Sequence, residues 1–451
     1  MYELKEYQSK ALAEALDFDL NALLAVATGL GKTIITLEAF RRVKSAWPGL
    51  IICPANVKWQ WQKQTMAHLG VHATVLEGEK PKQLSKSARR LYIVNYDVLP
   101  YWEDQLAKVP LGCIVTDECQ NLANEGRQRT DAFIRLTQNI PHFLALSATP
   151  LLNRPRELYP VLSVLNPGKW GSFYQYAQRY CNPKLTPWGW TYNGASNLDE
   201  LHRKLKKRCM IRVTKDAETL PPKKRILRHV ELSKPDEYET ALSDFVSWLA
   251  KHSAVKARRA MKALEMSKMT HLRMLVGRLK ARAVVEWIDN WLDAHPDEKL
   301  VVVGWHRQML KVLHKRCAAN SIVIDGSTSN KLRQQFVDRM KHDRKLRLLI
   351  GNINSLGVGV DGLQHMSRTI AFAELPWRPA DVVQAEDRLF RIGQTRRTNV
   401  YYLVAKGTIE AKMCRMLQVK QGVISNVLDG GKRDDDLQIH DQLVQELLTS
   451  A

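Results

Sequence analysis

No two cysteines of this 451-residue chain stand at the C-x-x-C spacing of zinc fingers and ribbons. The seven cysteines form an odd number, which argues against a disulfide framework. Apolar stretches are also short, and none approaches the roughly 18 residues needed to span a bilayer. The N-terminus is charged from Glu3 onward, unlike a signal peptide. We therefore expect buried, reduced thiols in a cytoplasmic, intracellular protein that is neither secreted nor attached to a membrane.

Acidic residues are scarce relative to basic ones. The chain has 46 Asp and Glu against 68 Lys and Arg, a formal net charge of +22. Such an excess indicates a polyanionic partner, and nucleic acid is the commonest one. A basic surface that is merely solvated is the alternative. The length favours two domains and allows three.

Short apolar runs that end in polar or glycine-rich loops recur in two parts of the chain. The first part has "NALLAVATG", "LIICPA", "RLYIVNYD", "GCIVTDE" and "HFLALSATP", and the later part has "KLVVVGWH", "SIVID", "LRLLIGN", "RTIAFAEL" and "NVYYLVAKGT". Such runs, separated by helical patterns, are typical of parallel sheets covered on both faces. The pattern predicts an α/β fold with two parallel-sheet lobes, at 1–155 and 280–430, and ligands at the carboxyl ends of the strands.

The segment between these lobes, 156–279, has a helical pattern and a different charge. Residues 251–282 carry ten Lys or Arg and a single acid, Glu265. We expect a basic helical insertion whose outer face contacts phosphate, with a salt-solvated bundle as the alternative. Residues 431–451 predict a short acidic tail.

The stretch "VATGLGKT" predicts a phosphate-binding loop at the end of the first strand. Its two glycines let backbone N–H groups face an anion, and the following helix presents its positive end. Lys32 would reach the β- and γ-phosphates of ATP, and Thr33 would hold Mg²⁺. The general pattern has glycine where this chain has Val26, and a glycine-rich helix start without ligand is the alternative. The expected nucleotide-binding residues are Thr28, Gly29, Leu30, Gly31, Lys32 and Thr33.

Two adjacent acids, Asp117 and Glu118, end another apolar run. In nucleotide hydrolysis one acid supports Mg²⁺, here Asp117, while the second polarises the attacking water, here Glu118. Successive residues at a strand end point in opposite directions, which would separate the two roles. Cys119 has no second cysteine or histidine at metal-binding spacing, so we expect a buried, space-filling side chain.

The order of these motifs resembles that of superfamily-two helicases of the Swi/Snf type. The motifs are "LKEYQ", the phosphate loop, "IICPANVKWQWQ", "DECQ", "SATP", "RVTKDAETLPPKK" and, most specific, "QAEDRLFRIGQT". The segments "RYCNPKLTPWGWTYNGASNLDEL", "FAELPWRPADVVQAEDR" and "YYLVAKGTIEAKM" are most similar to the annealing-helicase (HARP-like) branch. The resemblance covers residues 1–430 and implies two RecA-like lobes with a helical insertion between them.

The resemblance also implies roles for single residues. Gln8 would read the adenine edge, and Ser147 and Thr149 of "SATP" would link nucleotide state to lobe movement. Arg388 and Arg391 would be arginine fingers from the second lobe. From "RLFR" alone, an ion pair with Glu386 or Asp387 is the alternative. The remaining implied residues are Gln384, facing the γ-phosphate or the attacking water, and Gly357, Gly359 and Asp361, touching DNA backbone and nucleotide.

Loops at one edge of both lobes are expected to grip the DNA backbone without reading sequence. For the tryptophans at 59, 61, 188, 190 and 377 we expect core packing rather than base stacking. The DNA-contact candidates are Lys58, Asn95, Tyr96, Arg307 and Thr328.

Three features depart from the pattern of the group. The acid motif ends in Cys119 and Gln120 where Ala-His or Gly-His is usual, and we expect Gln120 to bridge the lobes by hydrogen bonds, so that activity is kept. "SATP" is the general helicase form. The chain begins almost at "LKEYQ", so we expect no branched-DNA recognition module ahead of it and a compact motor from a bacterium, a phage or a mobile element.

These observations favour an ATP- and Mg²⁺-dependent DNA-dependent ATPase that translocates on double-stranded DNA and anneals or remodels branched DNA. We expect a monomer that works with replication or recombination proteins. A strand-separating DNA or RNA helicase is the first alternative. A nucleotide-gated scaffold that binds nucleic acid without catalysis is the second.

Overall fold

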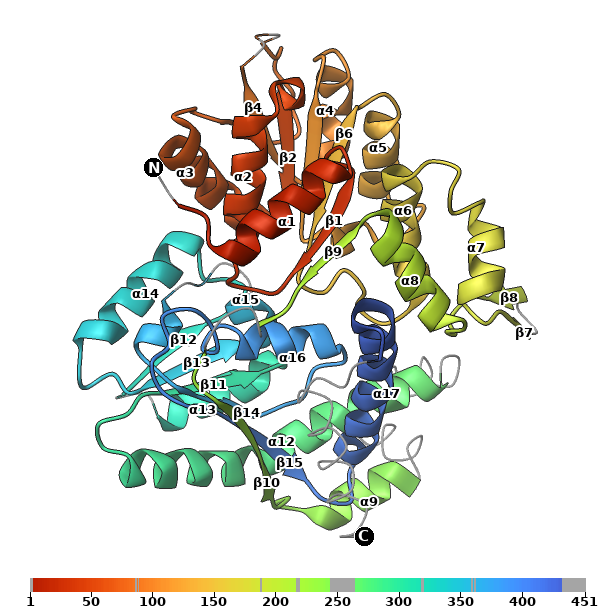
Figure 1. The fold of residues 1–451 in the computed structure, drawn as a ribbon. Coiled ribbons are helices and arrows are strands. Elements are labelled where there is room, and N and C mark those ends of the chain that lie inside the picture. Colours follow the sequence, from red (N-terminus) through yellow and green to blue (C-terminus); the bar gives the residue numbers. More distant parts are fainter. Residues whose placement is uncertain are drawn as a thin grey trace. The chain divides into compact units, whose positions relative to one another are not determined.

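The computed structural model divides into two compact units, and both are α/β (Figure 1). Unit 1 comprises residues 1–219 and 420–433, and unit 2 comprises 220–419 and 434–451. The structure describes residues 3–85, 87, 89–186, 189–215, 220–243, 264–317, 320–357, 360 and 362–431. The acidic tail predicted at 431–451 lies outside these residues, apart from Gly431. None of the helices in these ranges is long and apolar enough to cross a membrane.

Unit 1 is built on a seven-stranded sheet in which every pair of neighbours is parallel. Its order is β3 (Thr74–Val75), β4 (Leu91–Asn95), β2 (Gly49–Cys53), β5 (Cys113–Asp117), β6 (His142–Leu146), β1 (Ala22–Val26) and β9 (Met210–Val213). All residues of β1, β2, β4 and β6 are buried, as expected for a parallel sheet covered on both faces.

Alternate strand residues of this sheet enter two apolar clusters. Leu24 and Val26 pack with α1 (Glu6–Asp17), α2 (Lys32–Arg42) and α3 (Lys58–Leu69) on one face. Leu23 and Ala25 pack on the other face with α4 (Leu99–Leu106) and α5 (Gln128–Thr137). Between β6 and β9 the chain adds α6 (Tyr159–Leu165), α7 (Phe173–Tyr180), α8 (Leu198–Arg208) and the antiparallel pair β7 (Lys184–Thr186) and β8 (Gly189–Thr191).

Unit 2 has a six-stranded sheet, again parallel throughout. Its order is β10 (Lys223–Val230), β15 (Thr398–Ala405), β14 (Thr369–Phe372), β11 (Leu300–Gly304), β13 (Leu348–Asn352) and β12 (Ser321–Ile324). Its helices are α9 (Pro235–Ser243), α12 (Leu264–Ala294), α13 (Arg307–Arg316), α14 (Asn330–His342), α15 (Ile353–Gly357), α16 (Pro379–Glu386) and α17 (Ile409–Asp429), whose last residues belong to unit 1. The two parallel-sheet lobes expected from the apolar runs are confirmed.

The segment 156–279, expected as an insertion, supplies strands to both sheets. β9 pairs with β1 in unit 1, and β10 pairs with β15 in unit 2. The division between the units therefore falls at residue 219, inside this segment, and not at its ends. Of the basic stretch 251–282, residues 251–263 lie outside the described ranges, and the remainder belongs to α12.

A fully buried ion pair joins α12 to the start of α17 within unit 2. Lys280 is 0% exposed, and its Nζ donates to Glu410 Oε1 at 2.6 Å and to the Leu403 carbonyl at 2.7 Å. The other carboxylate oxygen of Glu410 accepts the N–H of Ala405 at 2.9 Å. Because both charges have several partners, the pair holds two helices against the end of β15.

Removing one charge of this pair should destabilise unit 2 strongly. We expect Lys280→Met to lower the free energy of unfolding by about 3–5 kcal/mol, because it leaves a buried carboxylate without its cation. The double variant Lys280→Met with Glu410→Gln should lose clearly less. Urea unfolding checks this, with the exposed Lys412→Met as control. A single variant no less stable than this control would contradict the expectation.

Candidate functional site

The segment after β1 turns through two glycines in the left-handed conformation, Gly29 with φ 81° and Gly31 with φ 87°. Gly31 is the N-cap of α2, so the loop leads directly into the free N–H groups of a helix. Lys32 Nζ donates to the Val26 carbonyl at 3.0 Å. Val26 itself is a fully buried strand residue, which explains why this position is apolar. The loop therefore has the backbone of an anion-binding site.

Gln8 lies against this loop from α1. Its Nε2 donates to the Leu30 carbonyl at 3.1 Å, and its Oε1 accepts the N–H of Lys5 at 3.0 Å. A Cβ at Gly31 would stand 2.4 Å from Gln8 Nε2, so only glycine allows this approach. The Gln8 side chain thus braces the loop, while the expected adenine contact stays a prediction.

Asp117 is the last residue of β5 and is held from two sides. Its Oδ2 accepts the indole N–H of Trp61 at 2.9 Å, and its carbonyl accepts the hydroxyl of Tyr96 at 2.7 Å. Desolvation, and next the charge of Glu118, raise the Asp117 pKa to about 6. The Trp61 N–H and the Lys32 ammonium act in the opposite direction. A nearby cation would stabilise the charged form of this desolvated carboxylate.

Glu118 follows with a left-handed backbone, φ 54°, which is uncommon for a residue with a side chain. Strand β5 ends at Asp117, so Glu118 is not a strand residue. The expectation that strand alternation makes the two carboxylates point in opposite directions is therefore wrong. The backbone turns at Glu118, and the carboxylates bond different partners. Strained backbone of this kind clusters at functional sites.

Gln120 connects the acid pair to the loop after β6. Its Nε2 donates to Glu118 Oε2, and its Oε1 accepts from Ser147 Oγ, both at 2.6 Å. Ser147 Oγ in turn accepts the N–H of Thr149 at 3.0 Å. Gln120 therefore bridges "DECQ" and "SATP" within unit 1, while the expected bridge between the lobes stays a prediction. Cys119 beside it is buried in the apolar cluster, where desolvation raises the thiol pKa.

The three DNA-contact candidates of unit 1 are almost fully buried in the fold. Asn95, Tyr96 and Lys58 are 6%, 3% and 7% exposed. The Tyr96 hydroxyl is bound to Asp117, and Lys58 Nζ donates to Glu77 at 3.3 Å. This arrangement gives Tyr96 a direct part in positioning the acid, a role that the sequence reading missed. Their contact with DNA stays a prediction.

In unit 2, the "QAEDRLFR" motif is anchored through its glutamate. Glu386 is 0% exposed and accepts from Lys223 Nζ at 3.0 Å and from Arg225 Nε at 2.7 Å, both on β10. The Tyr402 hydroxyl also donates to it. Arg388 Nη1 donates to the Val360 carbonyl at 3.2 Å. Gln384, Arg388 and Arg391 are partly buried and lie on or directly after α16.

Two further candidates follow strands of unit 2 at the carboxyl edge of its sheet. Arg307 is exposed at the start of α13, after β11. Thr328, after β12, accepts the N–H of Asp325 at 3.1 Å and so shapes its turn. Gly357 ends α15, whereas Gly359, Asp361 and Trp188 lie outside the described residues. Among the other tryptophans, Trp61 is buried, while Trp59 and Trp190 are more than half exposed, so core packing was the wrong expectation for these two.

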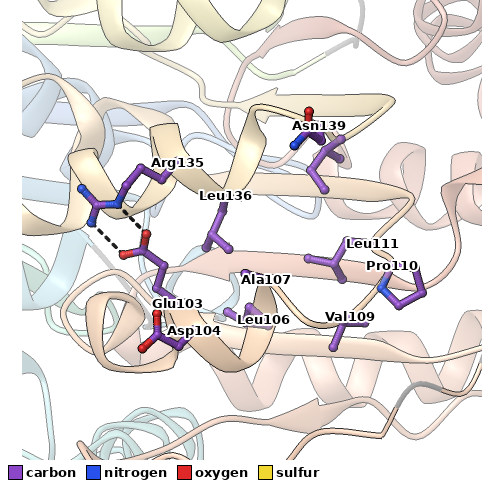
Figure 2. A pocket seen from close by; sticks show the side chains of 11 residues that line it. Glu103, Asp104, Leu106, Ala107, Val109, Pro110, Leu111, Arg135, Leu136 and Asn139 are labelled. Atoms are coloured by element: carbon purple, nitrogen blue, oxygen red, sulfur yellow. Dashed lines mark hydrogen bonds and ion pairs between the residues drawn. The ribbon is translucent and has the colours of Figure 1, made fainter.

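A separate cavity of about 350 Å³ lies between α4 and α5, where Leu111 and Ile140 precede β5 and β6 (Figure 2). Arg135 and Glu103 form an ion pair at its rim. Because it opens at the amino ends of these strands, it is not part of the site around Asp117. In the described ranges, no three or more His, Cys, Asp or Glu side chains gather to hold a metal ion by themselves.

Comparison with known families agrees with this arrangement. Residues 7–282 match the SNF2-related domain, more than half of the chain, and residues 280–393 match the helicase conserved C-terminal domain. The chain belongs to the SNF2-related family. ATP hydrolysis is the chemistry of this family. The resemblance drawn from the motifs is thereby confirmed.

Curated relatives of this SNF2-related chain cover nearly all of it. The SWI/SNF-related matrix-associated actin-dependent regulator of chromatin subfamily A-like protein 1 of Xenopus tropicalis is 30% identical over 427 residues, 93% of this chain and 44% of its own length. The DNA annealing helicase and endonuclease ZRANB3 of Homo sapiens is 29% identical over 446 residues, 95% of this chain and 41% of its own. The chain thus spans about half the length of the curated relatives it matches.

Two solved structures of the Sulfolobus solfataricus SWI2/SNF2 ATPase core are also similar. The one in complex with dsDNA is 22% identical with a TM-score of 0.46, and covers 99% of this chain and 96% of that one. The core domain alone is 21% identical with a TM-score of 0.45, and covers 100% and 94%.

The raised pKa of Asp117 predicts a pH-dependent stability difference in metal-free protein. Between pH 3.8 and about 6 the folded state keeps a proton that the unfolded state releases, so folding loses stability as pH rises through this window. We expect Asp117→Asn to be more stable than the parent above pH 6, by about 3 kcal/mol, and equal to it below pH 4. Thermal unfolding across pH checks this, and a parent more stable at pH 7 would contradict it.

Proposed function

We propose that the chain is an ATP-driven motor that translocates on double-stranded DNA and anneals or remodels branched DNA. The observation that carries the proposal is the succession of motifs on neighbouring strands. The phosphate loop follows β1, Ser147 follows the adjacent β6, and Asp117 ends the next strand, β5. Parallel pairing places all three at one edge, where ligands of such sheets bind. The names of the curated relatives support the choice of DNA annealing.

Lys32 and the N–H groups of the loop would hold the phosphates of ATP, with Gln8 supporting the loop and reaching the adenine. Thr33 and Asp117 would hold Mg²⁺, because hydroxyl and carboxylate oxygens are the donors that this ion prefers, together with water and phosphate. The raised pKa of the Asp117 carboxylate is consistent with a cation site, because a bound cation would stabilise its charged form. When bound, Mg²⁺ neutralises charge on the phosphates.

Glu118 is the proposed water activator. Its carboxylate is oriented by Gln120, which also holds Ser147, so the base and the "SATP" loop are linked by two hydrogen bonds. A change at the nucleotide would therefore reach the loop through Gln120. Such a link supplies the coupling for which the family usually uses histidine.

The second unit would contribute positive charge. Arg388 and Arg391 are the proposed arginine fingers and Gln384 the proposed γ-phosphate or water contact, and all three are close in sequence to Glu386, which is anchored to β10. Stabilisation by such an arginine is worth about 10³–10⁵ in rate. If hydrolysis requires this charge, nucleotide state controls closure of the two lobes, and repeated closure moves the protein along a strand.

DNA contact is proposed for the carboxyl edge of unit 2. Arg307 is exposed there, and Thr328, Gly357, Gly359 and Asp361 are further proposed contacts. The net charge of +22 favours a polyanion, and contact with phosphates gives affinity without sequence preference. On these grounds we propose a duplex-tracking motor, with partner proteins of replication or recombination.

Removing the Gln120 bridge should impair hydrolysis more than binding. We expect Gln120→Ala to lower kcat about tenfold, because Glu118 loses an orienting hydrogen bond, and to leave the Kd for ATP within about twofold. Steady-state hydrolysis and nucleotide titration check this, with the exposed Gln138→Ala as control. Equal losses of kcat in both variants would argue against the bridge.

The proposed function is tested by hydrolysis assays on single-stranded, duplex, forked and RNA substrates at two salt concentrations. We expect duplex and fork to stimulate hydrolysis at least tenfold. Glu118→Gln should lower kcat about 10²–10⁴-fold while ATP still binds, and Lys32→Ala should lose binding as well. The exposed Glu79→Gln is the matched control.

Movement is measured separately, by displacement of a third strand from a triplex and by annealing of a bubble. ATP-dependent release of one strand from a tailed duplex, without annealing, would replace the proposal by a strand-separating helicase. Hydrolysis unchanged in Glu118→Gln and Lys32→Ala would overturn the proposed site and favour a nucleotide-gated scaffold.

A further inference from the structure

Arg212 of β9 and Asp429, the last residue of α17, form a two-armed ion pair within unit 1. Arg212 Nε donates to Asp429 Oδ1 at 2.7 Å, and Nη2 donates to Oδ2 at 3.3 Å. The side chains are 22% and 15% exposed, so water competes only partly for the contact. Planar, two-armed pairs of arginine with carboxylate fix orientation as well as distance.

The remaining arm of the same guanidinium reaches the nucleotide-binding edge. Arg212 Nη1 donates to the carbonyls of Ala25 and Ala148, both at 3.2 Å. Ala25 is one residue before Val26, whose carbonyl accepts from Lys32. Ala148 lies between Ser147 and Thr149 of "SATP". One side chain thus ties the backbone at the start of the phosphate loop to the backbone of the neighbouring loop.

Helix α17 carries Asp429, and its two ends pack into two different apolar cores. At its beginning, Met413 and Cys414 belong to the core of unit 2. At its end, Val427 and Leu428 are 0% and 1% exposed in the core of unit 1 with Leu201. The Val427 carbonyl is also 2.9 Å from the ring Nδ1 of His202. One continuous helix therefore begins among core residues of unit 2 and ends among core residues of unit 1.

We propose that Asp429 is a positioning residue that acts through Arg212 on the nucleotide site. Asp429 orients the guanidinium, and the guanidinium holds the backbone on both sides of the site. A displacement of the end of α17 withdraws the carboxylate and loosens both carbonyl contacts. This gives unit 2 a route to the phosphate loop that does not use the arginines of "QAEDRLFR".

The coupling part of this inference rests on the proposed function, whereas the positioning part does not. Asp429 touches no residue that we assign to phosphate, Mg²⁺ or water. Its loss should therefore keep the basal kcat at saturating ATP, raise the KM for ATP because the phosphate loop is loosened, and weaken the response to DNA. Arg212→Lys should act in the same direction, because an ammonium group cannot bond a carboxylate with two arms and two carbonyls in a plane.

The positioning is tested by hydrogen exchange of the full chain without nucleotide. In Asp429→Asn, which keeps the side-chain shape, we expect amide exchange at residues 26–31 and 147–149 to be about tenfold faster than in the parent. Asp429→Glu should restore slow exchange, and the exposed Asp199→Asn should not change it. Thermal unfolding confirms that all variants are folded. Unchanged exchange at both loops in folded Asp429→Asn would overturn the inference.

The coupling is tested by hydrolysis with and without duplex DNA. We expect Asp429→Asn to keep the basal kcat and to lose about tenfold in DNA stimulation, with rescue by Asp429→Glu. Faster exchange in Asp429→Asn together with full stimulation by DNA would refute the coupling but leave the positioning in place. Absence of stimulation in the parent would count against the proposed function and leave the exchange result to decide the positioning.

Discussion

Parallel pairing of strands is the constraint on which the rest of the molecule depends. When every strand runs the same way, each loop that follows a strand emerges at one edge, and each connection must cross back over a face. The chemistry then needs no elaborate scaffold: Val26, Asp117 and Leu146 end three successive strands of one sheet. Alternate burial of strand residues in two apolar clusters keeps these ends in register.

The buried carboxylates fall into two groups, which differ in the partners that surround them. Glu386 and Glu410 each have a cation and further hydrogen-bond donors, and they fix elements in place. Asp117 accepts hydrogen bonds from the Trp61 indole and from the backbone N–H of Glu118, and burial together with the charge of Glu118 raises its pKa. A buried carboxylate with a raised pKa destabilises the fold when it is charged, and a bound cation would relieve this cost. The contrast separates the candidate site from the ion pairs around it.

Sequence patterns predicted the parts of this arrangement that are local. Apolar runs marked the strands around Val26 and Asp117, and glycine marked the turn before Lys32. The patterns did not predict that "KKRILRHV" is strand β10, because four of its eight residues are Lys or Arg, and such a basic run suits an edge strand as well as a surface helix. Nor could they show that Tyr96 turns inward to Asp117, or that Arg212 meets Ala25 across 187 positions of sequence. Such contacts depend on strand order, which no short motif encodes.

Helix α17 makes unit 1 discontinuous, since its core includes Ile424, Val427 and Leu428 from the far end of the chain. During synthesis, residues up to 219 leave the ribosome long before these partners exist. The surface that α17 covers stays open until residues 220–419 of unit 2 have been made. The candidate nucleotide-binding edge is therefore completed after residues 220–419, and a chain interrupted before Asp429 lacks the carboxylate that orients Arg212.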